Sequence, residues 1–169
     1  LILAREANDT LNIAWALSHK GFYARWGSPY DQKVAELEES VALFRKLNDK
    51  FGLCHTLFRR ASVAYAQEDF ATAQERLVET AVLAEEAGDK VTTGWGHFLL
   101  AEMACRNRDF EQANRYYEKS LSVFLEARFM IGAGDALSGM AMIARENKND
   151  SQVRATYEKA LLLLRERAP

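Results

Sequence analysis

Turn-forming residues are scarce in this sequence. Its 169 residues include 9 Gly and 2 Pro, too few to supply the many turns of a β-sandwich or a β-barrel. Cysteine occurs only as Cys54 and Cys105, which do not form a Cys-x-x-Cys pair. A disulfide framework would need more cysteines, so we interpret both as reduced, small hydrophobic residues.

Neither sign of charge dominates, and long apolar runs are missing. The 22 Lys and Arg residues against 24 Asp and Glu give a net charge of −2, which argues against direct binding to nucleic acid or to an acidic membrane. No apolar run approaches the ~20 residues of a transmembrane helix, and no basic segment precedes an apolar one as in a signal peptide. We therefore expect a cytoplasmic protein. Since the first residue is Leu1 rather than Met, we also expect a piece of a longer chain.

What the chain does contain is an ungapped internal repeat of 40 residues, which indicates a repeat architecture. Asp9, Asp49 and Asp89 share one column of the repeat. Two columns hold small residues and one holds large apolar residues: Gly21, Ala61, Ala101 and Ala141; Ala24, Ala64, Ala104 and Ala144; and Leu37, Leu77, Tyr117 and Tyr157. Because several columns agree at once, the repeat predicts the organisation of the whole chain.

Each repeat is predicted to form two helices, because apolar residues recur at three- and four-residue spacing. Asp69, Asp109 and Asn149 are suited to cap the second helices, and the small columns let paired helices approach closely. The first helices are predicted near 10–27, 50–67, 90–107 and 130–147, and the second near 30–47, 70–87, 110–127 and 150–167. Residues 1–8 would end an earlier helix. Residues 1–169 then form one domain, with repeats near 10–48, 50–88, 90–128 and 130–168.

These columns resemble the tetratricopeptide repeat, as in Leu57, Ala61, Ala64, Phe70, Ala73, Leu77 and Thr80. The usual unit of that family has ~34 residues. Longer units resemble those of bacterial MalT-like transcription activators, STAND-type signalling ATPases and peptide-sensing regulators of the Rap type. The resemblance implies an all-α, right-handed superhelix of antiparallel helix pairs. The departures from the family pattern are Lys33 and Val153 in place of Ala, Asp150 in place of an aromatic residue, and Arg128-Phe129 in place of Gly-Asp.

Signatures of catalysis are missing from the sequence. No Gly-x-x-x-x-Gly-Lys-Ser/Thr loop is present, and Gly132-Ala133-Gly134 does not complete a dinucleotide-binding pattern because Leu137 stands at its third glycine. Close helix packing is our interpretation of Gly94, Gly96, Gly132 and Gly134. His19, His55 and His97 fall in different columns and share no metal-ligand spacing. We expect no enzyme activity, no cofactor and no metal site.

The resemblance also implies that the first helix of each repeat lines a concave surface. The predicted binding residues on that surface are Trp15, Phe22, Arg25, Trp26, His55, Phe58, Arg59, Tyr65, Trp95, Phe98, Glu102 and Arg106. Aromatic residues and Arg dominate binding energy at interfaces, so we expect this surface to bind a protein or peptide segment. Two alternatives stay open: packing against other units or another domain of the same protein, and no special role.

The charge pattern of this surface narrows the expected ligand. Family members that bind chaperone C-termini use a Lys and Asn clamp, whose places here hold Ser18, Phe22, Arg59, Trp95 and Leu99. Because only one of these is basic, a largely apolar or aromatic segment carrying an acidic residue is a better fit.

The expected function is therefore a non-catalytic interaction or effector-sensing module of a larger bacterial signalling or transcription regulator. The alternative is a regulatory or oligomerisation segment of a multidomain enzyme, such as a signalling ATPase or cyclase, with no ligand of its own. Leu161, Leu163 and Leu164 occupy apolar columns of the last predicted helix, so we also expect self-association through it.

Overall fold

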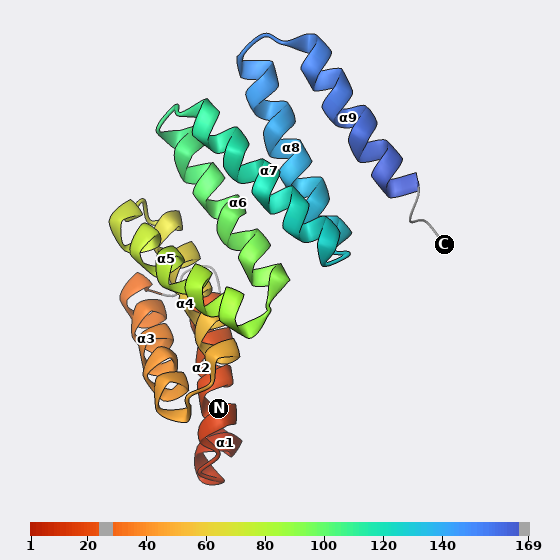
Figure 1. Ribbon diagram of the computed structural model, residues 1–169. Helices are drawn as coiled ribbons and strands as arrows, with labels where there is room; N and C mark the ends of the chain where they lie inside the picture. The colour runs from red at the N-terminus through yellow and green to blue at the C-terminus, as the bar shows by residue number, and fades with distance from the viewer. Residues whose placement is uncertain (24–28, 166–169) are drawn as a thin grey trace. The chain divides into compact units, whose positions relative to one another are not determined.

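The computed structural model describes residues 1–23 and 29–165, leaving out the side chains at 152, 160 and 163–165, and every regular element in this part of the chain is an α-helix. The described residues form the helices α1 (Ile2–Glu6), α2 (Thr10–Tyr23), α3 (Tyr30–Leu47), α4 (Lys50–Ala66), α5 (Phe70–Ala87), α6 (Lys90–Arg106), α7 (Phe110–Glu126), α8 (Met130–Glu146) and α9 (Asp150–Arg165) (Figure 1). Helices adjacent in the sequence pack as pairs, which is the arrangement of an α-solenoid and confirms the predicted fold class.

The helix boundaries follow the 40-residue register. Helices α3 and α5 begin and end at the predicted residues, while α4, α6, α7 and α8 end one residue earlier than predicted. Helices α2 and α9 begin where predicted, and their predicted ends, 27 and 167, lie outside the described residues. None of the helices in the described ranges is long and apolar enough to cross a membrane.

One type of turn joins successive helices wherever the connection lies within the described residues, which leaves out the link from α2 to α3. At each such turn one residue adopts a left-handed backbone, with φ between 53° and 67°: Asn8, Asn48, Glu68, Gly88, Arg108, Arg128 and Lys148. The residue that follows donates its N–H five residues back, as Asp49 does to the Phe44 carbonyl at 3.1 Å. This pattern is the Schellman motif, which satisfies the last carbonyls of a helix.

Aspartate after the left-handed residue begins the next helix. The side chains of Asp49, Asp69 and Asp109 accept the N–H of the residue three positions later, at 3.0, 3.1 and 3.0 Å. The predicted caps Asp69 and Asp109 are thereby confirmed. One residue thus ends one helix and caps the next, and this keeps each connection short. Phe129, which replaces Asp before α8, makes no side-chain cap.

The chain divides into two compact units, Leu1–Thr92 and Thr93–Pro169, each of which is described by itself. In the first unit, α2 to α5 pack in succession, and α2 also contacts α4. The core of this unit contains Phe44, which lies against Gly52 so closely that a Cβ there would come within 2.2 Å of the ring. Glycine is needed at this position because the helix backbone touches the ring directly. The single domain and the hand of the superhelix stay predictions.

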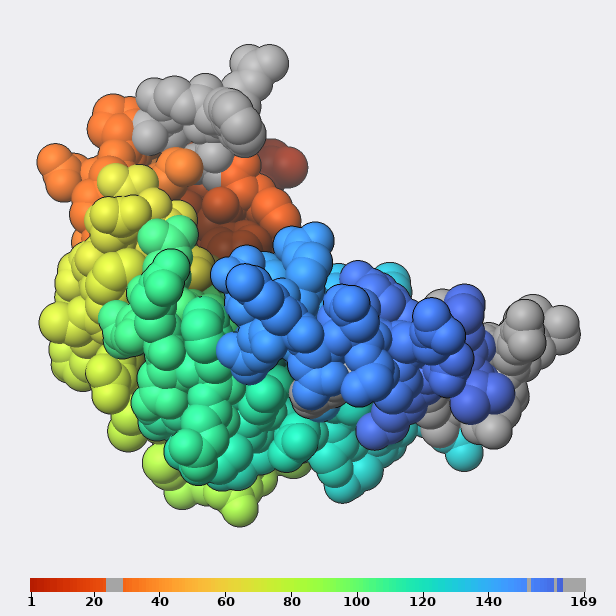
Figure 2. Space-filling view, turned by 90° about the horizontal axis from the view of Figure 1, so that it is seen from above, coloured from red at the N-terminus to blue at the C-terminus, as the bar shows by residue number. Residues whose placement is uncertain are grey.

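In the second unit, α7, α8 and α9 pack in succession, and Figure 2 shows α8 and α9 as adjoining blue surfaces. The small columns lie in the core of each unit as predicted, with Ala64 fully buried and Ala104 6% exposed. Tyr157 of α9 is 53% exposed, although Leu37, Leu77 and Tyr117 of the same column are buried. Leu161 is exposed as well, while the side chains of Leu163 and Leu164 lie outside the description.

Phe124 is the centre of the second unit's core and lies between two glycines. A Cβ on Gly94 would come within 2.5 Å of its ring, and one on Gly132 within 2.7 Å. Close packing therefore explains these two glycines. It does not explain Gly96 and Gly134, where a Cβ would meet no atom within 4 Å; that interpretation was wrong, because two residues further along a helix the side-chain direction has turned to the opposite face.

Candidate functional site

Aromatic and basic side chains of α2 and α4 interleave in the first unit. Helix α2 contributes Trp15, His19 and Tyr23, and helix α4 contributes Phe51, His55 and Arg59. Residues four apart lie on one face of a helix, so each helix presents three side chains to the other. We refer to these six residues as the aromatic–cationic ladder.

Ring contacts run along the whole ladder. The Trp15 ring lies 6.1 Å from Phe51 and 6.0 Å from His55, measured between ring centroids. His19 stacks on Tyr23 at 5.9 Å with an interplanar angle of 13°. The Arg59 guanidinium lies 5.9 Å from the centre of the Tyr23 ring and 5.8 Å from that of Phe22, within the range of cation–π attraction.

Two buried hydroxyl groups, those of Ser18 and Thr56, fix the position of the Arg59 guanidinium. Its Nη1 donates to Ser18 Oγ at 2.8 Å, and Thr56 Oγ1 donates to the same oxygen at 2.9 Å. Ser18 and Thr56 are fully buried, so their positions are fixed by packing as well as by hydrogen bonds. Ser18, one of the chaperone-clamp places considered above, is therefore a support of the site and does not face a ligand.

Arg59 has no carboxylate partner among the described residues. Burial lowers the pKa of its guanidinium, but a guanidinium titrates so far above neutral pH that it keeps its charge. A half-buried cation without a counter-charge is costly unless a partner or ligand supplies one. Burial, followed by the charges of Arg59 and His55, lowers the pKa of His19 and so favours its neutral form, whereas Arg59 keeps its positive charge at any physiological pH.

His55, unlike Arg59, is fixed by a contact with a carboxylate. Its Nε2 lies 3.0 Å from Asp89 Oδ2, and Asp89 also accepts the backbone N–H of Thr92 at 3.1 Å. Burial alone would raise the pKa of Asp89, but hydrogen bonds from His55 and Thr92 lower it from 3.8 to about 2. The pair ties α4 to the start of α6 within the first unit and orients the imidazole of the ladder.

Catalytic chemistry finds no support near this pair. Burial, aided by the negative charge of Asp89, raises the pKa of the Cys54 thiol to about 12, and Cys54 is fully buried. A thiol in this state is not a nucleophile at neutral pH. Within the described ranges no group of three or more His, Cys, Asp or Glu side chains could hold a metal ion.

The predicted residues of the second unit lie on α6 and belong partly to its core. The Trp95 ring contacts Phe98, Phe124 and Phe129 at centroid distances of 5.4, 5.1 and 6.1 Å. Glu102 accepts a hydrogen bond from the Tyr117 hydroxyl. Arg106 is exposed at the end of α6.

Of the predicted binding residues, the structure brings Trp15, Phe22, His55 and Arg59 together. Phe58 and Tyr65 are half-buried on α4, and Arg25 and Trp26 lie outside the described residues. Three ladder members were not predicted: His19, Tyr23 and Phe51. The four-residue spacings from Trp15 to Tyr23 and from Phe51 to Arg59 would have indicated them.

Comparison with known proteins gives no family assignment. No protein-family model matches the chain, and a search of curated proteins finds no match.

Proposed function

We propose that the first unit is a non-catalytic module that binds a protein or peptide segment through the aromatic–cationic ladder. The single observation that carries this proposal is Arg59, a half-buried cation held by Ser18 and by two aromatic rings, with no carboxylate partner in the described part of the chain. An acidic residue of a ligand would supply the missing charge. Such an ion pair, between partly desolvated groups, is stronger than one on an open surface.

The aromatic members of the ladder define the rest of the ligand. Tyr23, beside the cation, is 68% exposed, and Phe51, at the other end of the ladder, is 50% exposed. Aromatic side chains and Arg are the residues most often responsible for binding energy at interfaces, because they bury large areas at a small cost in side-chain entropy. The ligand that fits best is a segment with an Asp or Glu next to aromatic or branched apolar residues.

The wider setting of this module is proposed from the resemblance to tetratricopeptide repeats. Turns that recur every 20 residues from Asn48 to Lys148, and helix pairs closed by Ala columns, support that resemblance. By the same resemblance, the parent protein is a cytoplasmic signalling or transcription regulator of bacterial type, whose output domain responds to the bound segment.

A second candidate function is self-association, as in an oligomerisation segment of a multidomain enzyme. The observation that favours it is α9, where Tyr157, Leu161 and Leu162 are each more than half exposed. An apolar surface of this kind on a helix is a common site of chain–chain contact.

Peptide binding is tested with two short, terminally blocked peptides that alternate Asp with Phe and Leu, the second having each Asp replaced by Asn. Calorimetric titration of the whole chain should show binding of the Asp peptide and binding about tenfold weaker for the Asn peptide, since about 1.4 kcal/mol of ion pairing is lost. Arg59→Gln should reduce binding of the Asp peptide to the level of the Asn peptide.

Two further variants keep this test decisive. Lys46→Gln removes one positive charge from an exposed position on α3 and should leave binding unchanged. Tyr23→Ser removes an exposed ring of the ladder without altering the core, and it should weaken the binding of both peptides. The proposal fails if neither peptide binds at millimolar concentration, or if Arg59→Gln, shown to be folded by circular dichroism, binds the Asp peptide as the wild type does.

A further inference from the structure

The helix pair α2–α3 differs from its counterparts at one buried column. Position 33 on α3 holds Lys. The equivalent residues are Ala73 on α5 and Ala113 on α7, and both are fully buried. A lysine has no room where an alanine closes a helix seam. In the first repeat α2 still approaches the α3 backbone closely at this position, since a Cβ on Gly21 would lie 2.9 Å from the Lys33 carbonyl oxygen, and the Lys33 side chain is half-buried rather than enclosed.

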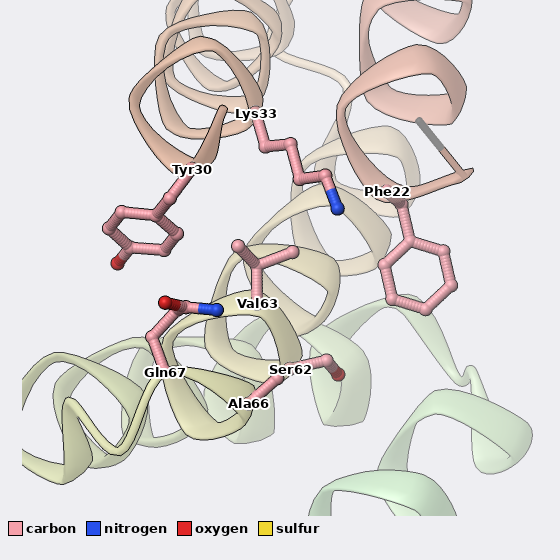
Figure 3. A pocket seen from close by; sticks show the side chains of 7 residues that line it. All are labelled: Phe22, Tyr30, Lys33, Ser62, Val63, Ala66 and Gln67. Atoms are coloured by element: carbon pink, nitrogen blue, oxygen red, sulfur yellow. The ribbon is translucent and has the colours of Figure 1, made fainter. Parts of the chain in front are cut away.

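Lys33 lines a cavity of about 340 Å³. Its walls come from the end of α2, the start of α3 and the last turns of α4: Phe22, Tyr30, Lys33, Ser62, Val63, Ala66 and Gln67. Figure 3 shows the Lys33 side chain reaching between Tyr30 and Phe22, with its ammonium group above Val63 and the amide of Gln67 turned toward the same space. The volume is within the range of pockets that hold small ligands.

The Lys33 ammonium has no ion-pair or hydrogen-bond partner in the described ranges. The acidic residue one helical turn further along α3, Glu36, is already engaged by Lys20 of α2 and by Gln32. No acidic residue lines the cavity in the described part of the chain. The three N–H donors of the Lys33 ammonium are therefore available to a ligand in a cavity whose described lining residues are otherwise uncharged.

From this geometry we infer that the Lys33 cavity binds a small organic monocarboxylate with an apolar or aromatic body. The carboxylate would pair with the Lys33 ammonium and accept from the Gln67 amide, while the body would lie between the Phe22 ring, Val63 and Ala66. A single lysine balances a single negative charge. A phosphate group, which carries nearly two charges at neutral pH, would be left under-compensated.

This cavity shares the Phe22 ring with the surroundings of Arg59, but its cation is Lys33, whereas the peptide-binding proposal depends on Arg59. Failure of one does not affect the other, because the two use different cations and are tested with different probes. Replacing Lys33 leaves the ladder intact, and the ladder variants leave Lys33 intact.

Phenylacetate and its neutral isostere phenylacetamide test the inference, each titrated calorimetrically into the whole chain. Phenylacetate should bind at millimolar concentration or below, and phenylacetamide about tenfold more weakly. Lys33→Met, which keeps the side-chain length but removes the charge, should abolish the difference between the two probes. Lys46→Met, on the exposed end of the same helix, is the matched control and should behave as the wild type does.

A third variant guards against loss of folding. Lys33→Ala restores the residue found at Ala73 and Ala113, so it should fold and should bind neither probe. The inference is overturned if phenylacetate does not bind the wild type at millimolar concentration, if phenylacetamide binds equally well, or if Lys33→Met and Lys33→Ala, both folded by circular dichroism, still bind phenylacetate normally.

Discussion

Alanine substitutions at two glycines of α8 should change stability in opposite directions, although the two positions are only two residues apart. Gly132 faces the Phe124 ring, whereas Gly134 faces open space. At Gly134 the new methyl group meets nothing, and alanine is favoured over glycine in a helix interior by about 0.8–1.0 kcal/mol. Gly134→Ala should therefore raise the free energy of unfolding by about 0.5–1 kcal/mol.

At Gly132 the same gain is outweighed by overpacking. The added Cβ would lie 2.7 Å from Phe124 Cε2 and Cζ, about 1 Å inside an ordinary carbon–carbon contact. The ring cannot retreat toward α6, because the backbone of Gly94 already lies against it, with a Cβ position only 2.5 Å away. Overpacking of a tight core costs about 1–3 kcal/mol, so Gly132→Ala should be less stable than wild type by about 1–2 kcal/mol.

Urea denaturation followed by circular dichroism measures both effects on the same helix. The free energies of unfolding of the two single variants should differ by about 1.5–3 kcal/mol, with the same dependence on urea concentration. Adding Phe124→Leu to Gly132→Ala should recover part of the loss, because the smaller side chain vacates the space that the methyl group enters. Equal effects of Gly132→Ala and Gly134→Ala, or no coupling with Phe124, would refute the reasoning.

Three further predictions concern other parts of the molecule. Ala104→Leu should overpack the α6–α7 seam and lower the free energy of unfolding by about 1–3 kcal/mol; an unchanged melting temperature would contradict this. Because the pKa of Asp89 is lowered from 3.8 to about 2, its charge stabilises the fold above about pH 4 and ceases to do so as the pH falls through about 2. The stability difference between wild type and Asp89→Asn, in which Asn can still cap α6, should accordingly shrink by on the order of 2 kcal/mol over that interval; urea titrations showing a constant difference would argue against the contact with His55. Finally, light scattering should show self-association of the wild type that is lost when Leu161 and Leu162 are both replaced by Glu; a concentration-independent monomer mass for the wild type would exclude it.

The helices and their turns could be predicted from the sequence because the signals are local. Asp69 and Asp109 cap helices through a hydrogen bond to the residue three positions on, at 3.1 and 3.0 Å, and this depends on almost nothing outside one turn. Ala64 and Ala104 could be predicted to be buried because a column of small residues indicates the positions where two paired helices approach each other closely. A 40-residue register repeats each signal, which separates it from chance.

The site was predicted only in part, because its chemistry depends on contacts distant in the sequence. The sequence marks Arg59 as basic but not that it rests on Ser18, 41 residues away. It likewise gives no sign that His55 pairs with Asp89, which also serves as an ordinary helix cap. Lys33 is visible as a departure from a column of alanines, yet only the structure shows that it lines a cavity.

The described turns of this chain share one backbone conformation, so one could replace another. The packing contacts between its helices differ from repeat to repeat. This difference limits which segments of the array can be deleted or duplicated. Deleting residues 49–88 would join Asn48 to Asp89 and rebuild the same left-handed turn. It would also bring Thr92 to the position of Gly52, where even a Cβ comes within 2.2 Å of the Phe44 ring. Phe recurs at 124 and Gly at 132, while the intervening repeat has Ala84 and Thr92. We expect two repeats, rather than one, to be the smallest segment whose loss or duplication leaves every seam matched.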